Sequence, residues 1–187
     1  MSGFFRKNEG DTPDQARQNQ RPGPPRSNEG RSAPMNITIE ERTAIPTLMH
    51  WRKEVIVNVF GVIPSKALLV ANRRYYNTHI ADGTHIAIVA FIDGADAGCG
   101  AICLTDELPS PDNPSGRCAY LMNIYVRREY RRHGIAHAIV RWLVEKAQSL
   151  GCDKIYLETT DGAKPVYTEI GFVDLPNIMK YAEIHDR

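Results

Sequence analysis

The sequence predicts a mixed α/β (α+β) fold for one domain over residues 35–187. Stretches of strand length and stretches with apolar residues at helical spacing follow one another along this part of the chain. Their order reads β-α-α-β-β-β-α-β-α-β, which is typical of a mixed, mostly antiparallel central sheet flanked by helices. The predicted strands are 36–40, 85–92, 97–104, 118–126, 154–159 and 172–182.

The first 34 residues have a different composition. They contain five Pro, four Gly and only five apolar residues, and carry a local net charge of +2. Such a segment cannot bury enough apolar surface to offset an ordering entropy of about 1–2 kcal/mol per residue. We therefore predict a disordered tail over 1–34, with a basic arm that contacts a partner as the functional alternative.

Two helices are predicted after the first strand. Thr43 can cap the first helix, with Pro46 in its first turn, where a missing N–H is tolerated. Ser65 can start the second, which ends near Gly83. Three aromatic residues of these helices have two readings, as core residues or as the lining of an acceptor pocket: Trp51, Tyr75 and Tyr76.

The next three strands are separated by two different connections. The strand 85–92 is nearly all apolar, which favours a central position, and Asp93-Gly94 predicts a tight hairpin after it. A Pro-rich loop over 106–116 precedes the strand 118–126 and is long enough to be functional.

The remaining elements follow a regular helix. Residues 135–150 carry one apolar stripe that ends at Gly151, a usual C-terminal residue of helices. The strand 154–159, a short helix over 161–170 and an extended stretch over 172–182 complete the domain.

The joint between the strand 118–126 and this helix has the chemistry of an anion site. Basic residues stand at positions 127, 128, 131 and 132, and Gly134 and Ala136 open the helix. A helix N-terminus has about four N–H groups without partners and a positive dipole end, and small residues let an anion approach them. The alternative is an exposed basic helix start. Neither a Rossmann nor a Walker A glycine pattern is present.

Two segments resemble the GCN5-related N-acetyltransferase (GNAT) family. Arg131-Arg-His-Gly134-Ile-Ala136 is similar to the family's Arg/Gln-x-x-Gly-x-Gly/Ala signature, and Ala163-Lys-Pro-Val-Tyr167-Thr-Glu-Ile-Gly171-Phe172 to its Ala-x-x-x-Tyr-x-x-x-Gly-Phe segment. With Ile124-Tyr-Val126 resembling the family's fourth strand, the likeness covers most of residues 36–182. It implies one GNAT-like domain that moves an acetyl group from acetyl-CoA to a primary amine of a small molecule or protein, by direct attack with both substrates bound.

The resemblance also implies roles for particular residues. Backbone groups of the fourth strand would bind the pantetheine arm and thioester, and the helix start would bind the pyrophosphate. Tyr167 would act as general acid, since a phenol stays protonated at neutral pH. Glu158 is the first candidate for the base, ahead of Asp161, Asp106, Glu107 and Glu129. The implied cofactor-binding residues are Ile124, Tyr125, Val126, Arg131, Arg132, His133, Gly134, Ile135 and Ala136.

The chain departs from the family pattern at two positions. Thr160 stands where the family often has an Asn that contacts CoA, and Asn123 stands where the fourth strand often has a Glu that serves as base. These departures leave cofactor binding intact in principle but put the proton route and the acceptor class in question.

Composition limits the other function classes. The chain has 23 Lys plus Arg and 22 Asp plus Glu, a net charge of +1 that leaves −1 for residues 35–187, so nucleic acid is disfavoured as a partner. No apolar run approaches the roughly 20 residues of a membrane span, and no secretory leader is recognisable, so we expect a cytoplasmic protein.

The remaining expectations concern metals and partners. The four cysteines lack paired spacing and are expected to be free thiols. His133 and His137 could chelate zinc at i, i+4, but surface histidines are favoured and no metal is expected. A non-catalytic acyl-CoA sensor or interaction module is the alternative to the enzyme, and a homodimer is left open.

Overall fold

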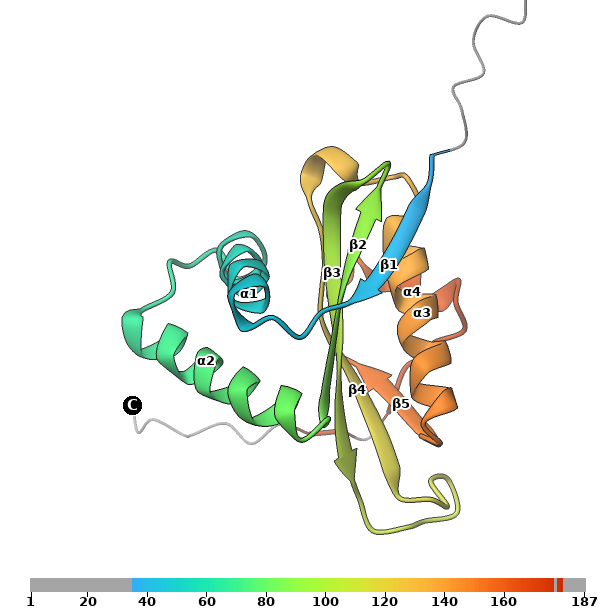
Figure 1. Cartoon of the computed structure of the whole chain (residues 1–187). Coiled ribbons are helices and arrows are strands. Elements are labelled where there is room, and N and C mark those ends of the chain that lie inside the picture. The colour runs from blue at the N-terminus through green and yellow to red at the C-terminus, as the bar shows by residue number, and fades with distance from the viewer. Residues whose placement is uncertain (1–34, 177, 180–187) are drawn as a thin grey trace, which may run out of the picture. The chain divides into compact units, whose positions relative to one another are not determined.

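The computed structural model describes residues 35–176, 178 and 179, so the predicted tail over 1–34 lies outside the described residues. Five strands and four α-helices follow one another along this part of the chain (Figure 1). Their bounds are β1 (Ile37–Glu41), α1 (Ile45–Val59), α2 (Lys66–Ala81), β2 (His85–Ile92), β3 (Ala95–Asp106), β4 (Arg117–Val126), α3 (Ile135–Ser149), β5 (Lys154–Leu157) and α4 (Lys164–Thr168).

The strands form one sheet in the order β1-β2-β3-β4-β5. The pairs from β1 to β4 are antiparallel, and β5 runs parallel to β4. The predicted mixed, mostly antiparallel sheet is therefore confirmed. β2 is an inner strand, as its apolar run predicts, although β3 takes the middle position. Asp93 and Gly94 form the hairpin turn, both with positive φ (48° and 82°).

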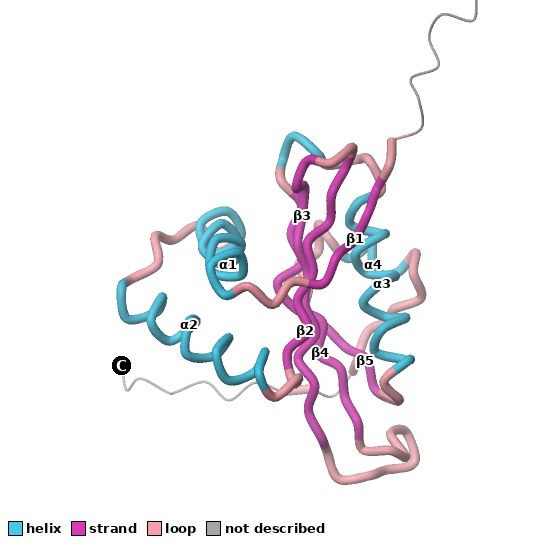
Figure 2. The backbone as a smooth tube through the Cα atoms, in the orientation of Figure 1, coloured by secondary structure: helices cyan, strands magenta, loops and turns pink. Residues whose placement is uncertain are grey.

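Helices cover both faces of the sheet, with α1 and α2 on one face and α3 and α4 on the other (Figures 1 and 2). The α3 stripe of Ile135, Ile139, Leu143 and Ala147 is at most 1% exposed and lies in the main core. Gly100 of β3 allows this close packing, because a Cβ there would stand 2.7 Å from Cγ2 of Ile139. The other face has two smaller cores, formed with residues of α1 and α2.

The structure confirms one of the two predicted helix caps. The Ser65 hydroxyl accepts a hydrogen bond from the Leu68 N–H (3.1 Å), which confirms the predicted cap of α2. The Thr43 cap is wrong: Ala44 is the N-cap residue of α1 and makes no side-chain cap. Pro46 explains the later start, since its fixed φ favours the first turn without a capping side chain.

The C-terminal elements are shorter than predicted. β5 ends at Leu157 and α4 has only five residues. The predicted strand over 172–182 is wrong for residues 172–176, 178 and 179, none of which joins the sheet. Val173 is 86% exposed, and Pro176 has no N–H to donate to a strand partner. Residues 177 and 180–182 of this prediction lie outside the described residues.

Candidate functional site

The parallel strands β4 and β5 pair over only four residues. Cys118–Leu121 of β4 lie beside Lys154–Leu157, and β4 then continues to Val126 without a described strand on that side. This leaves an unpaired backbone edge over residues 122–126. The predicted cofactor residues Ile124, Tyr125 and Val126 lie on this edge.

A β-bulge marks the start of the unpaired edge. Tyr125 pairs with Cys99 and Met122 with Ala101, so Asn123 and Ile124 both lie opposite Gly100. Asn123 has φ 56°, in the left-handed region that Asn adopts more readily than most residues. Bulges bend a strand and redirect its side chains. Asn123 was expected only as a departure from the family pattern, and the bulge was not predicted from the sequence.

The loop from β4 to α3 has the features expected of an anion cradle. After a short 3₁₀ turn (Arg128–Tyr130), Arg132 and Gly134 adopt positive φ (65° and 80°) and α3 begins at Ile135. Within the described chain, the N–H groups of residues 132–137 donate to no protein acceptor. A Cβ on Gly134 would meet nothing within 4 Å, so its backbone borders open space.

The side chains of this loop differ in exposure and in their hydrogen bonds. Arg132 and His133 are exposed, whereas Ile135 is buried in the core. Arg131 Nε donates to the Val126 carbonyl (3.0 Å) and so ties the loop to the end of β4. The structure therefore brings residues 124–126 and 131–136 together at one end of β4.

Arg127 takes no part in the basic cluster at this joint. It makes two hydrogen bonds to the Glu54 carboxylate (2.8 and 3.0 Å) and an ion pair with Asp96 (3.0 Å). Its guanidinium carbon lies 4.4 Å from the Trp51 ring centre. The Glu54 carboxylate raises the pKa of Arg127 above its ordinary value. The expectation that four arginines supply charge here is thus reduced to Arg128, Arg131 and Arg132.

Tyr167 lies on α4, on the α3 side of the sheet. It is half-buried and packs against the main core, with its ring centre 6.0 Å from that of Phe172. Burial raises the pKa of its phenol, and the hydroxyl has no hydrogen-bond partner among the described residues. Tyr167 lines a cavity of about 730 Å³ formed by residues of α3, β5, α4 and 170–175.

Glu158 lies on the opposite face from Tyr167. It follows β5 directly, and strand alternation places it with Tyr156, whose ring stacks 5.2 Å from Tyr120 on β4. Burial raises the pKa of Tyr120, and the Glu158 carboxylate adds to this rise. The structure therefore does not bring the predicted acid and base into contact.

The other candidate bases are exposed carboxylates. Glu107 is held by Lys154 (2.9 and 3.0 Å), whose ammonium lowers the pKa of Glu107. Asp106, Glu129 and Asp161 are exposed. Thr160, at the position of the family's Asn, accepts the Ala163 and Lys164 N–H groups with its carbonyl and so precedes α4.

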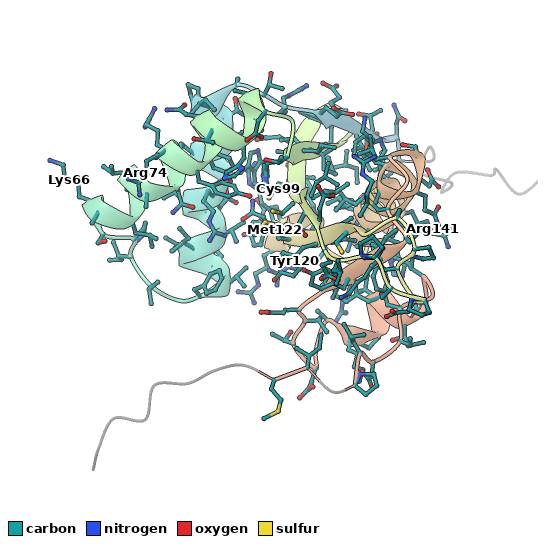
Figure 3. All side chains as sticks on the ribbon, turned by 90° about the horizontal axis from the view of Figure 1, so that it is seen from below. Lys66, Arg74, Cys99, Tyr120, Met122 and Arg141 are labelled. Atoms are coloured by element: carbon teal, nitrogen blue, oxygen red, sulfur yellow. The ribbon has the colours of Figure 1, made fainter. Side chains whose placement is uncertain are left out.

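A second cavity of about 560 Å³ lies on the α1 and α2 side. Tyr75 and Tyr76 line it, but Tyr76 is only 4% exposed and, like Trp51 (2%), lies in a core cluster. The pocket interpretation therefore fits Tyr75 best, and the core interpretation fits Trp51 and Tyr76. Figure 3 shows Arg74 of α2 together with Tyr120 and Met122 of β4 on this side of the sheet, and Arg141 on the other. The other lining residues were not predicted from the sequence; they are Arg52, Ala71, Asn72, Arg74, Thr78, His79, His85, Met122 and Asn123.

A buried polar cluster lies beside this cavity. His85 is 4% exposed, its Nδ1 lies 3.2 Å from the Tyr75 hydroxyl, and its Nε2 has no partner in the described chain. Burial lowers the pKa of His85 to about 4, with further lowering by His79 and Arg52. The Tyr75 hydroxyl donates to Cys103 Sγ (3.4 Å), and burial raises the pKa of Tyr75 and that of Tyr76.

All four cysteines are free thiols, as predicted, and only Cys103 is not fully buried. His137 contacts Glu169 (2.7 Å) rather than His133. Within residues 35–176, 178 and 179, no cluster of three or more His, Cys, Asp or Glu could hold a metal ion. No helix in the same part of the chain is long and apolar enough to cross a membrane.

The sequence of the chain is similar to those of known proteins. Residues 50–172 match the acetyltransferase (GNAT) family. A thialysine N-epsilon-acetyltransferase from Sus scrofa is 33% identical, covering 39% of this chain and 56% of its own length. N-acetyltransferase 8F1 from Rattus norvegicus is 34% identical, covering 42% of this chain and 37% of its own. The chain thus spans about half or less of these relatives.

Solved structures match over more of the chain. A predicted acetyltransferase with acetyl-CoA from Clostridium acetobutylicum has a TM-score of 0.69 and 26% identity, covering 79% of this chain and 96% of its own. A GCN5-related N-acetyltransferase from Ralstonia eutropha shares the fold, with a TM-score of 0.64 and 19% identity over 79% and 98% of the two chains. The matched family, the unpaired edge of β4 and the loop before α3 lead to one conclusion: the chain belongs to the GNAT acetyltransferase family.

Proposed function

We propose that the chain is an acetyl-CoA-dependent N-acetyltransferase that acts on a primary amine of a small molecule or protein. The observation that carries this proposal is the junction of two features, the unpaired β4 edge and the N–H groups of residues 132–137 that donate to no protein acceptor. The similar Clostridium acetobutylicum structure contains acetyl-CoA, which supports the choice of co-substrate.

The residues at this junction fit the parts of acetyl-CoA. Backbone groups of Ile124 and Val126 would hold the pantetheine arm as a strand partner would. The N–H groups and positive dipole end at the start of α3 would hold the pyrophosphate, with Arg132 and His133 beside them. The side chain of Tyr125 is 7% exposed and packs on Trp51, and its backbone pairs with Cys99 of β3, so this residue would support the edge rather than contact the co-substrate.

Two side chains, on opposite faces of β4 and β5, would transfer the protons of the reaction. Acetyl-CoA supplies a thioester, and the amine nitrogen replaces the CoA sulfur at the acetyl carbon. Tyr167 would give its phenolic proton to the departing sulfur from the α3 side, since burial keeps its pKa above the ordinary value. Glu158, on the other face, would accept the proton of the incoming ammonium, directly or through water. The Tyr167 hydroxyl has no partner among the described residues and is available to donate a proton, which supports an enzyme over an acyl-CoA sensor.

Two further proposals concern the setting of the protein. The four free thiols support a reducing, cytoplasmic location. The homodimer stays a prediction, which light scattering of the purified chain would check.

Binding of acetyl-CoA tests the cofactor proposal. At 100 times its Kd, the ligand should add about 2.7 kcal/mol to the free energy of unfolding and so raise Tm. Gly134→Glu should abolish this rise, because it puts bulk and negative charge into the cradle. Gly83→Glu is the matched control, since Gly83 also has positive φ (74°), meets no atom within 4 Å at a Cβ, and lies at the end of α2.

The two variants separate binding from strain. Both should lower Tm of the free protein to a similar extent, and only Gly83→Glu should keep the rise with acetyl-CoA. A rise retained in Gly134→Glu would place the cofactor elsewhere, and no rise in the unmodified chain would reject acetyl-CoA as co-substrate.

A further inference from the structure

Arg52 is a half-buried arginine whose charge is not neutralised by any described carboxylate. Its Nε donates to Asn72 Oδ1 (3.0 Å) and its Nη1 to Asn123 Oδ1 (2.9 Å). Among residues 35–176, 178 and 179, no Asp or Glu oxygen lies within 4.0 Å of its nitrogens. Arg127, which is similarly shielded, has two such partners, Glu54 and Asp96.

Holding the helices in place does not require this charge. Arg52 links α1, α2 and β4 through two neutral amide oxygens, which a neutral donor could also satisfy. A positive charge in a partly desolvated place is unfavourable unless an opposite charge compensates it. The Phe60 ring, whose centre lies 5.7 Å from the guanidinium carbon, offsets part of this cost. A guanidinium with no carboxylate partner among the described residues is therefore suited to an anionic ligand.

The cavity that Arg52 lines also carries more positive than negative charge. Arg74 lines it and makes no ion pair in the described structure, and no Asp or Glu is among the lining residues. His79 also lines it, but Asp82 lies 3.7 Å from its Nδ1 and offsets any charge there. The excess of positive charge thus belongs to Arg52 and Arg74.

The position of the cavity relates this charge to the reaction. It extends from Asn123, at the bulge of β4 beside the proposed thioester position, to Arg74 and His79 on α2. Arg52 spans from Asn123 of β4 to Asn72 of α2 through its two hydrogen bonds, and Arg74 lies on α2. An amine whose nitrogen reaches β4 would therefore have its far end in the cavity that both guanidinium groups line. A second ammonium at that end would be repelled, and an anionic oxygen group would be attracted.

We infer that the acceptor is a small primary amine that also carries an anionic carboxylate or phosphate, held by Arg52 and Arg74. This inference rests on the proposed N-acetyltransferase function and narrows its substrate class. Guanidinium groups bind both kinds of oxyanion through paired hydrogen bonds. Diamines and longer polyamines are excluded as preferred acceptors.

Three amines of equal chain length isolate the charge at the far end: 5-aminopentanoate, pentylamine and 1,5-diaminopentane. Their Kd values for the full chain loaded with CoA can be measured by NMR titration, which needs no turnover. We expect 5-aminopentanoate to bind about tenfold more tightly than pentylamine, as for a charge-assisted hydrogen bond, and 1,5-diaminopentane to bind most weakly. Adding 4-aminobutyl phosphate distinguishes a phosphate preference from a carboxylate preference.

Variants of α2 test whether the arginines cause this order. Arg74→Glu should reverse the preference between the acid and the diamine, and because Arg74 is exposed the fold should tolerate it. Arg73→Gln is the matched control, since Arg73 is also exposed but lines a different cavity, between α1 and α2. Arg52→Gln should remove most of the preference while keeping a donor for Asn72 or Asn123.

The outcomes separate this inference from the proposed function. Equal binding of the three amines, tighter binding of the diamine, or a preference unchanged in both Arg74→Glu and Arg52→Gln would overturn the inference. CoA release with the same amines tests acetyl transfer independently. An anion preference without CoA release would support the inference about the cavity and reject the proposed reaction for these amines.

Discussion

His85 couples folding to pH, because its ring is buried in the neutral form. Its pKa is about 4 in the folded chain, against an ordinary value of 6.5. Between these two values the unfolded chain binds more protons than the folded one, so the free energy of unfolding falls as the pH is lowered through this range. The full effect of this shift is about 3 kcal/mol.

The variant His85→Asn should remove this pH dependence. Asn keeps a polar atom near the position of Nδ1 but does not titrate. Urea unfolding between pH 7.5 and pH 4 should show a decrease for the unmodified chain that exceeds the decrease for His85→Asn by about 3 kcal/mol. His133→Asn, at an exposed position, should keep the full decrease. Parallel curves for the unmodified chain and His85→Asn would contradict the assignment.

Tyr167 is the residue whose proposed role depends on a single oxygen atom. Tyr167→Phe keeps the ring that packs on Phe172 and the main core and removes only the hydroxyl, which has no hydrogen-bond partner among the described residues. We expect kcat to fall about 100-fold, a typical contribution of general acid catalysis, with the Kd of acetyl-CoA nearly unchanged. Steady-state rates and binding titrations check this, with Tyr130→Phe as a control outside the proposed catalytic groups. Unchanged kcat would remove the acid role.

At the scale of elements, one cluster joins α1 to the ends of β3 and β4. Arg127 follows β4, Glu54 and Trp51 belong to α1, and Asp96 belongs to β3. The side chains of Arg127 and Glu54 are each 19% exposed, so solvent screens their interaction only in part. This cluster fixes the helix that carries Arg52 relative to the strand that carries Asn123.

Removing one charge of this cluster should destabilise the domain. Arg127→Met leaves the partly buried Glu54 with only His50 nearby (3.6 Å) and should lower the free energy of unfolding by about 2 kcal/mol. Glu54→Gln combined with Arg127→Met should recover part of the loss. Glu107→Gln, which breaks the more exposed pair with Lys154, should cost less than Arg127→Met, because solvent screens this pair. Urea denaturation of the four proteins measures these differences, and equal effects at both pairs would show that burial does not matter here.

For the whole molecule, local sequence patterns predicted most helices and strands and the part of the candidate site that lies between β4 and α3. The cradle could be predicted because residues 124–126 and 131–136 are almost contiguous, so the strand, the glycine turn and the helix start are all visible in one stretch of sequence. The cavity that Arg52 and Arg74 line could not be predicted, because residues from four separate elements form it. The Arg52–Asn123 bond joins residues 71 positions apart, and the Glu54–Arg127 pair joins residues 73 apart.

The errors also have physical causes. A Pro near the start of α1 replaced the expected Thr43 cap. The bulge at Asn123 depends on the register of β4 against β3, which alternation within one strand does not reveal. Arg127 looked like part of a basic cluster because the sequence does not show which way a side chain turns at the end of a strand.

The parallel pairing of β5 has a consequence for the order of folding. β2, β3 and β4 are antiparallel neighbours along the chain and can form while the chain is still being synthesised, since their contacts close short loops. β5 can join only after α3 has crossed from one end of β4 to the other, as any parallel connection requires. β5, which borders the edge proposed to hold acetyl-CoA, therefore joins the sheet after the antiparallel strands. A ribosome must have released residues 127–157 before this strand can take its place beside that edge.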